Sequence, residues 1–330
     1  MGRTALQRAL SRAGLALRLH PGWREALPLR PGWQARWLAR VSGLLLAVLA
    51  GPLSAAGLTL TDDRGRSVSL PAPPARIVSL APHATEWLAA FGAAPRLVGL
   101  DPHSDYPPVL RGLPRLSAYP TPDVEAIAAL RPDLVVLWGA GLRRSALDRL
   151  AALGIATFVT EPHGLAGLAE SAQRLAPVAG DAVRAAQVLG AFRATLAALE
   201  ARHRTDSPLP VFIQVAQQPL FTITDRDPLA QALALCGVRN VFADAPGLSV
   251  AVGPEAVLAR APRVVIRVQG GQETEPWSRL GVLAPTGPLR MVAADPALAR
   301  PGPRLPALLA TVCAEIDAVR RPAGPVRAQG

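Results

Sequence analysis

The sequence predicts an α/β fold made of two Rossmann-like lobes joined by a long helical segment. Short strands of continuous apolar residues alternate with helical segments in two blocks, one before and one after residues 165–208. Strands of this kind are buried on both faces, which is typical of a mostly parallel sheet covered by helices. Half of the 330 residues are apolar, enough for two linked cores.

The N-terminal block opens with alternating apolar residues around a Gly-containing turn over 58–70, which predicts a hairpin. Apolar runs then predict strands at 77–80, 97–100, 134–138 and 155–159, and helices at 83–91, 122–130 and 143–153. In all we expect a leader at 1–56, an N-terminal lobe at 57–164, a linking helical segment at 165–208, a C-terminal lobe at 209–322 and a tail at 323–330.

The linking segment has helical spacing of apolar residues from Leu165 to about Arg204, with an interruption near Pro177 and Gly180. A surface helix of a single domain would show the same pattern, but the position between two α/β blocks favours a connecting helix. In the C-terminal lobe we expect strands at 211–215, 221–224, 264–268 and 289–293, and helices at 229–235, 255–259 and 306–319.

One helix–strand unit occurs in both lobes. Glu125 lies seven residues before Pro132, and Glu255 lies seven residues before Pro262. In each lobe the Glu begins a short helix that leads into a buried strand. Acidic residues are favoured in any first helical turn by the helix dipole. That preference does not explain the same Glu-to-Pro spacing in both lobes, so we expect a shared role.

Basic charge is concentrated in the leader. The net charge of +11 would suggest nucleic-acid binding if it were spread evenly. Eight arginines precede Gly57 against the single acid Glu25, which leaves 27 arginines against 23 acids in the rest of the chain. Nucleic acid is therefore not an expected partner.

The leader has the order of a secretory signal. Arg36 and Arg40 precede an apolar run at 41–50, and small residues follow at 54–56 after a Gly-Pro break. The run is too short to span a bilayer and precedes an A-x-A-like site. We therefore expect cleavage near Ala56 and a periplasmic protein; an uncleaved anchor is the alternative.

The chain has two cysteines, Cys236 and Cys313, both in the expected mature part. An isolated pair in an oxidising compartment favours one disulfide, and two buried thiols are the alternative. The expected export favours the disulfide.

Motifs of the common enzyme classes are absent from the sequence. We find no phosphate-binding loop, no dinucleotide fingerprint, no H-E-x-x-H and no G-x-S-x-G. The mature part has histidines at 83, 103, 163 and 203, too scattered to suggest a zinc site. We therefore expect binding rather than catalysis, with no resident metal or cofactor.

Residues 76–86, Arg-Ile-Val-Ser-Leu-Ala-Pro-His-Ala-Thr-Glu, resemble the first strand and helix of the helical-backbone (class III) substrate-binding proteins of ABC importers. This family binds cobalamin, haem and ferric siderophores. Residues 98–108, with Ser-Asp-Tyr-Pro-Pro, and residues 113–119 are similar to its cobalamin-binding branch. Further similarities lie at 130–134, 214–222, 257–260 and 300–304, so the resemblance covers roughly residues 58–320.

The resemblance implies capture of cobalamin or a related corrinoid in a cleft between the lobes, as a transported ligand. Aromatic side chains offer flat apolar area to a corrin ring, and Asp and Arg suit its peripheral amides. Core packing is the alternative for each aromatic. Carried over by position, the first wall is His103, Asp105, Tyr106, Tyr119 and Trp138, and the second is Phe221, Asp295 and Arg300.

Two departures from the cobalamin-binding branch concern its ligand contacts. A Trp is common there shortly before the helix at 255–259, but this chain has Gly-Leu-Ser-Val-Ala at 247–251. His103 stands where an aromatic such as Tyr is common. It is either a cobalt ligand from the open face or a loop histidine that forms hydrogen bonds.

The resemblance also implies a monomer that docks onto an ABC transporter permease dimer with its ATPase. Family members present one exposed Glu per lobe to arginines of the permease, and Glu125 and Glu255 match those positions. Cys236 and Cys313 match the family's disulfide. The same fold carrying haem or a ferric siderophore is the nearest alternative, and a cytoplasmic α/β enzyme is the alternative from another class.

Overall fold

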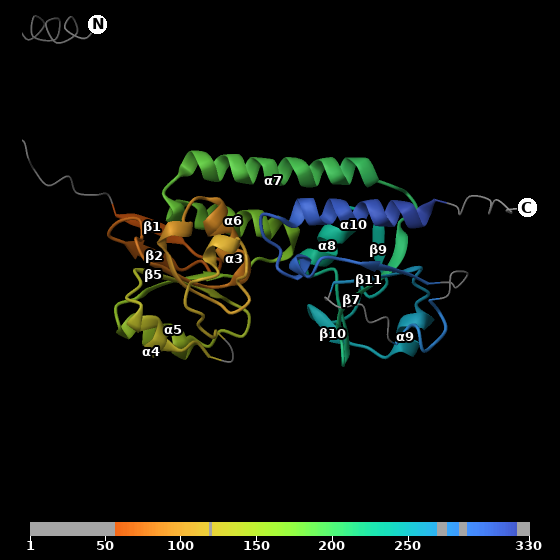
Figure 1. Cartoon of the computed structure of the whole chain (residues 1–330), viewed down its shortest axis with the longest axis horizontal. Helices are drawn as coiled ribbons and strands as arrows, with labels where there is room; N and C mark the ends of the chain where they lie inside the picture. The colour runs from red at the N-terminus through yellow and green to blue at the C-terminus, as the bar shows by residue number, and fades with distance from the viewer. Residues whose placement is uncertain (1–56, 119–120, 269–275, 284–288, 322–330) are drawn as a thin grey trace, which may run out of the picture. The chain divides into compact units, whose positions relative to one another are not determined.

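A computed structural model describes residues 57–118, 121–268, 276–283 and 289–321 (Figure 1). The chain divides into two compact units, Met1–Ser54 and Ala55–Gly330, and every described element belongs to the second. The expected secretory signal and its cleavage site lie outside the described residues.

The described chain begins with the hairpin that the alternating pattern predicted. β1 (Leu58–Thr61) pairs antiparallel with β2 (Ser67–Leu70). The turn between them is fixed by the buried Asp62, whose carboxylate accepts hydrogen bonds from two backbone N–H groups of the turn. The hairpin packs against β6 (Ala156–Thr160) and α6 (Gly164–Ala179).

Within the described residues, the N-terminal lobe has a four-stranded parallel sheet in the order β4-β3-β5-β6. One face packs against α3 and α6, and the other packs against α4 and α5. Burial on both faces explains why these strands are mostly apolar. The further elements are β3 (Ile77–Leu80), α3 (Pro82–Ala90), η2 (Ala94–Arg96), β4 (Leu97–Leu100), η3 (Pro108–Leu110), α4 (Val124–Ala129), β5 (Leu134–Trp138) and α5 (Arg144–Ala152).

The linking segment is helical, with a break where the sequence indicated one. Gly180 ends α6 in the left-handed conformation, with φ 71°, and the Asp181 side chain caps the start of α7 (Ala182–His203). α6 packs against α3 of the first lobe and α8 (Pro228–Ala234) of the second. α7 packs against α6 and α10 (Leu305–Arg320), so both helices connect the lobes.

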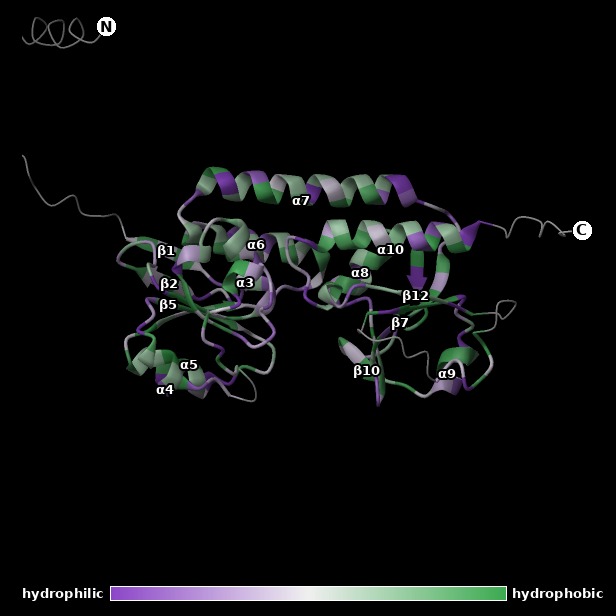
Figure 2. Cartoon of the chain, viewed as in Figure 1, coloured by the Kyte–Doolittle hydropathy of each residue, from purple (hydrophilic) through white to green (hydrophobic). Residues whose placement is uncertain are grey.

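By length and composition alone, α7 could cross a membrane. In the folded unit its Leu189, Phe192 and Leu196 are buried against neighbouring helices. Bands of hydrophobic and hydrophilic residues follow one another along the helix (Figure 2). The buried residues recur every three or four positions and most others are exposed, which fits a helix that packs along one side of a protein.

The C-terminal lobe has a mixed sheet in the order β10-β8-β7-β11-β12, with β9 also paired to β7, as far as the chain is described. β8 is antiparallel to β7 and β10, whereas β7, β9, β11 and β12 are parallel. The elements are β7 (Leu209–Gln217), β8 (Leu220–Ile223), β9 (Val238–Asn240), β10 (Ser249–Ala251), α9 (Pro254–Ala259), β11 (Val264–Arg267), β12 (Arg290–Ala293) and η4 (Pro296–Ala299).

A disulfide joins Cys236, directly after α8, to Cys313 within α10. Both cysteines are fully buried. This is the pairing that the sequence favoured over two free thiols. The bridge ties the C-terminal helix to the corner between α8 and β9.

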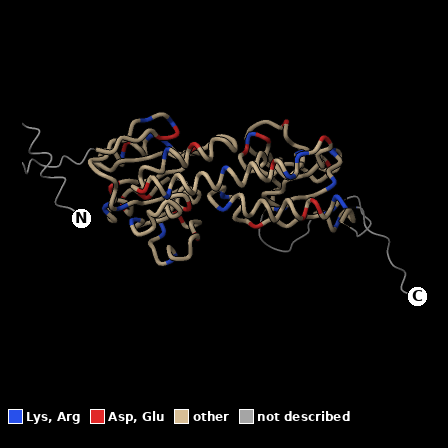
Figure 3. The backbone as a smooth tube through the Cα atoms, turned by 90° about the horizontal axis from the view of Figure 1, so that it is seen from above, with Lys and Arg blue, Asp and Glu red and all other residues tan. Residues whose placement is uncertain are grey.

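Basic and acidic residues are interspersed along the folded unit (Figure 3). Neither lobe has a long stretch of the tube in a single charge colour in this view. The distribution agrees with the small excess of basic over acidic residues from Gly57 onward.

Candidate ligand-binding cleft

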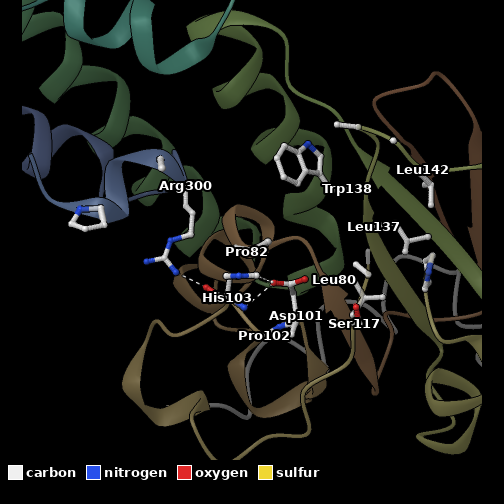
Figure 4. A pocket seen from close by; sticks show the side chains of 16 residues that line it. Leu80, Pro82, Asp101, Pro102, His103, Ser117, Leu137, Trp138, Leu142 and Arg300 are labelled. Carbon is white, nitrogen blue, oxygen red and sulfur yellow. Dashed lines mark hydrogen bonds and ion pairs between the residues drawn. The ribbon is translucent and has the colours of Figure 1, made fainter. Parts of the chain in front are cut away.

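A pocket of about 930 Å³ opens at the carboxyl ends of β3, β4 and β5, where parallel sheets usually bind their ligands. A segment at 296–300 of the C-terminal lobe completes the lining, so the pocket lies between the lobes (Figure 4). Its described lining comprises Leu80, Pro82, Asp101, Pro102, His103, Ser117, Ala118, Pro122, Leu137, Trp138, Ala140, Gly141, Leu142, Pro296, Ala299 and Arg300.

Most of this lining is apolar. Leu80, Leu137 and Leu142 lie near Trp138, which is 52% exposed although it ends a buried strand. The buried His83 meets the indole edge-on, with 6.1 Å between ring centres. Trp138 is thus not a core residue, and its exposed ring offers a flat apolar surface to a ligand.

An Asp–His pair forms the polar part of the N-lobe wall. Asp101 directly follows β4 and is buried, whereas the His103 side chain is 81% exposed. Asp101 Oδ1 lies 3.1 Å from His103 Nδ1 and accepts a 2.8 Å hydrogen bond from the His103 backbone N–H. The carboxylate therefore sets the position of the imidazole.

Asp105 and Arg300, both predicted ligand contacts, pair with each other across the lobes. Arg300 donates to the two carboxylate oxygens of Asp105 over 2.7 and 3.3 Å, and also to the His103 carbonyl. Burial alone would raise the pKa of Asp105, but the hydrogen bonds and charge of Arg300 outweigh it and hold the pKa below its usual value.

A second pair joins the lobes beside the first, and the sequence did not point to it. Arg304 donates to both carboxylate oxygens of Glu86, over 2.5 and 2.9 Å. The same guanidinium lies over the ring of Tyr106, 3.9 Å from its centre. Glu86 is buried in α3, so the pair is largely removed from solvent. Glu86 is the last residue of segment 76–86 and Arg304 the last of segment 300–304, and both segments carry the family resemblance. That resemblance is the sequence feature that could have indicated the pair.

Asp105 and Tyr106 lie beside the pocket but are not among its described lining residues, and the remaining predicted contacts are not brought together there. Among the described residues, Phe221 in β8 is half-buried outside the lining. Asp295 is also outside it and caps η4, accepting a 2.7 Å hydrogen bond from the Ala297 N–H. Tyr119 lies outside the described residues. Contact of these three with a ligand stays a prediction.

The two repeated glutamates occupy the same place in each lobe. Glu125 lies in the first turn of α4 and Glu255 in the first turn of α9, and both are exposed. Each helix ends two residues before a non-glycine residue with positive φ, Arg131 at 47° and Ala261 at 49°, and a proline follows. Glu125 also forms a 2.5 Å ion pair with Arg149.

The model of the family described as periplasmic binding protein matches residues 77–276. The chain belongs to this family. A vitamin B12-binding protein of Photorhabdus laumondii is 34% identical over 207 residues, which cover 63% of this chain and 75% of the relative. One from Yersinia pestis is 35% identical over 206 residues, covering 62% and 73%.

Solved structures of the same architecture show that this periplasmic binding protein has the class III fold. The periplasmic vitamin B12 binding protein BtuF of Vibrio cholerae is 27% identical with a TM-score of 0.66, covering 76% of this chain and 99% of that one. A periplasmic haem-binding protein from Pseudomonas aeruginosa is 25% identical with a TM-score of 0.63, covering 73% and 92%.

Proposed function

We propose that the protein captures a corrinoid, cobalamin or a close relative, in the cleft between its lobes and delivers it to an inner-membrane ABC importer. The observation that carries the proposal is the exposed Trp138 in an apolar pocket at the strand ends. Similarity to vitamin B12-binding proteins supports the choice of ligand. The protein acts by reversible binding, and the corrinoid is cargo rather than a cofactor.

The charges at the pocket favour a corrinoid over haem. Haem carries two propionates that need cationic partners, whereas the amides around a corrin ring are neutral. Arg300 is the one arginine among the described lining residues, and Asp105 already neutralises it. The nearby Arg304 is neutralised by Glu86 in the same way. A ferric siderophore would similarly need unpaired arginines.

Delivery requires a docking surface outside the cleft, and Glu125 and Glu255 supply one carboxylate per lobe. Their matched positions suit a permease with two similar subunits, each presenting basic side chains. Charged pairs of this kind steer association and fix its orientation. Removal of the leader near Ala56 would release the protein into the periplasm, where such an importer collects its ligand.

Ligand retention by the exported protein tests the proposal. After incubation with cobalamin, cobinamide or haem and then desalting, the visible spectrum should show a retained corrinoid. Trp138→Ala should weaken corrinoid binding by about 1–3 kcal/mol, because it removes buried aromatic contact. Leu153→Ala removes another exposed apolar side chain, outside the pocket, and should leave affinity unchanged.

Two results would count against this function. If haem were retained and both corrinoids were lost, the proposed ligand would be wrong, but the fold assignment would stand. Equal corrinoid affinity in Trp138→Ala and the wild type would mean that the ligand binds elsewhere.

A further inference from the structure

His103 is held in a defined position at the edge of the pocket. Its Nδ1 faces the buried Asp101 carboxylate at 3.1 Å, and the same oxygen accepts its backbone N–H. Arg300 binds the His103 carbonyl from the opposite lobe. Arg115 donates to the neighbouring Ser104 carbonyl over 2.6 Å. The loop is therefore fixed on both sides of the histidine.

The Asp101 contact determines which ring nitrogen is free. A carboxylate only accepts hydrogen bonds when ionised, so the neutral imidazole carries its proton on Nδ1 and its lone pair on Nε2. Nε2 lies at the other side of a ring that is 81% exposed and lines the pocket (Figure 4). A histidine whose second nitrogen is held by a carboxylate is the usual arrangement of a metal ligand.

We propose that Nε2 of His103 coordinates the cobalt of a bound corrinoid at an axial position. The inference rests on the proposed function and predicts that corrinoids with an exchangeable axial ligand gain a bond to His103 that other corrinoids lack. The corrin ring already supplies four nitrogens, so one protein side chain suffices. In the exchange a cobalt–oxygen bond to water breaks and a cobalt–nitrogen bond forms. Water leaves, and cobalt keeps its oxidation state.

The rest of the described lining offers no equivalent donor. Trp138 has an indole N–H without an available lone pair, and Arg300 has donors only. Asp101 is buried and engaged by His103. If His103 acted only as a loop residue, its loss would affect every corrinoid alike. Coordination instead predicts a difference between corrinoids with and without an exchangeable ligand.

Aquacobalamin and cyanocobalamin provide that comparison, because water exchanges readily and cyanide does not. The wild type should bind aquacobalamin with the visible spectral shift that replacement of water by an imidazole produces. His103→Ala should abolish the shift and weaken aquacobalamin binding about tenfold or more. Its affinity for cyanocobalamin should fall much less, because that ligand loses contact with the imidazole ring but no bond to cobalt. His163→Ala, at an exposed histidine outside the pocket, should behave as wild type throughout.

Asp101→Asn tests the positioning role of the carboxylate. It should retain a smaller fraction of the spectral shift, with thermal melts confirming that all variants are folded. An unshifted wild-type spectrum with aquacobalamin bound would overturn cobalt ligation and leave the proposed function standing. Equal loss of both cobalamins in His103→Ala would also overturn it. If the wild type retained neither cobalamin, the proposed function itself would be overturned. A haem spectrum that depends on His103 would show that His103 binds the iron of haem, and it would overturn cobalt ligation.

Discussion

Side chains around the cleft differ in how many of their polar groups already have partners within the protein. Trp138 leaves half of its surface exposed, and His103 uses one ring nitrogen. Arg300 and Arg304, by contrast, are both paired with carboxylates of the opposite lobe. A neutral ligand that stacks on the indole therefore needs to break none of these ion pairs, whereas an anionic ligand would compete with Asp105 and Glu86.

Burial of His83 should make stability depend on pH. Its Nε2 lies 2.9 Å from Thr160 Oγ1 inside the lobe. Burial lowers the pKa of His83 to about 4, and the charge of Asp63 opposes this only in part. The unfolded chain, with a pKa near 6.5, then binds the proton first as pH falls. Stability is full above about pH 6.5 and is lost toward pH 4, by at most about 3 kcal/mol.

Urea unfolding of the wild type and His83→Gln between pH 4 and 7.5 measures this contribution. The variant should be less stable at neutral pH, because it loses the buried ring beneath the pocket wall, yet its stability should fall less steeply below pH 6.5. Parallel pH profiles for the two proteins would show that His83 does not carry the effect.

At the scale of elements, burial decides what the sequence could predict. β3, β4 and β5 have the bounds expected from their apolar runs, because a strand buried on both faces needs apolar residues throughout. β9 and β10 were not predicted. Each has three residues, and β10 is mostly exposed, so neither carries a period or an apolar run long enough to recognise.

The ion pairs between the lobes could not be predicted from the sequence, for a different reason. Arg300 and Asp105 are 195 residues apart, and Arg304 and Glu86 are 218 apart. Nothing local links such partners, and each residue alone has the appearance of a solvated charge. The resemblance brought Asp105 and Arg300 forward as ligand contacts. Their observed pairing with each other depends on how the two lobes meet.

The disulfide should contribute strongly to the stability of the C-terminal lobe. It closes a loop with a sequence separation of 77, so constraint of the unfolded chain is worth up to about 4 kcal/mol. Cys236→Ala alone and the double variant with Cys313→Ala should lose nearly the same free energy of unfolding, because either removes the bridge. Urea denaturation under non-reducing conditions measures both. A loss below about 1 kcal/mol would contradict this estimate of the bridge.

Considered as a whole, the folded unit keeps the pocket apart from the two glutamates that we propose dock onto a transporter. The pocket lies where residues 296–300 meet the N-terminal lobe, and two ion pairs cross between the lobes there and beside it. Glu125 and Glu255 are exposed on α4 and α9 and take no part in the pocket lining that is described. We therefore expect that mutations can remove the proposed docking without affecting ligand binding.

The double variant Glu125→Ala with Glu255→Ala should bind corrinoid normally and fail to support uptake in cells that lack the native protein. Loss of the carboxylates removes the charge-assisted pairs expected with permease arginines, so the complex should not dock. Each single variant should retain partial uptake. A titration, an uptake assay and a thermal melt of the same proteins measure the three properties.

Two controls separate docking from stability. Arg149→Ala removes the exposed ion pair of Glu125 but leaves the carboxylate free to dock, so uptake should persist. Glu170→Ala with Glu200→Ala removes two exposed carboxylates from the linking helices and should also permit uptake. A role limited to the helix dipole predicts a stability loss of about 0.5 kcal/mol per Glu and normal uptake. Normal uptake by the Glu125 and Glu255 double variant would therefore remove the docking role and leave the repeated glutamates as helix-stabilising residues.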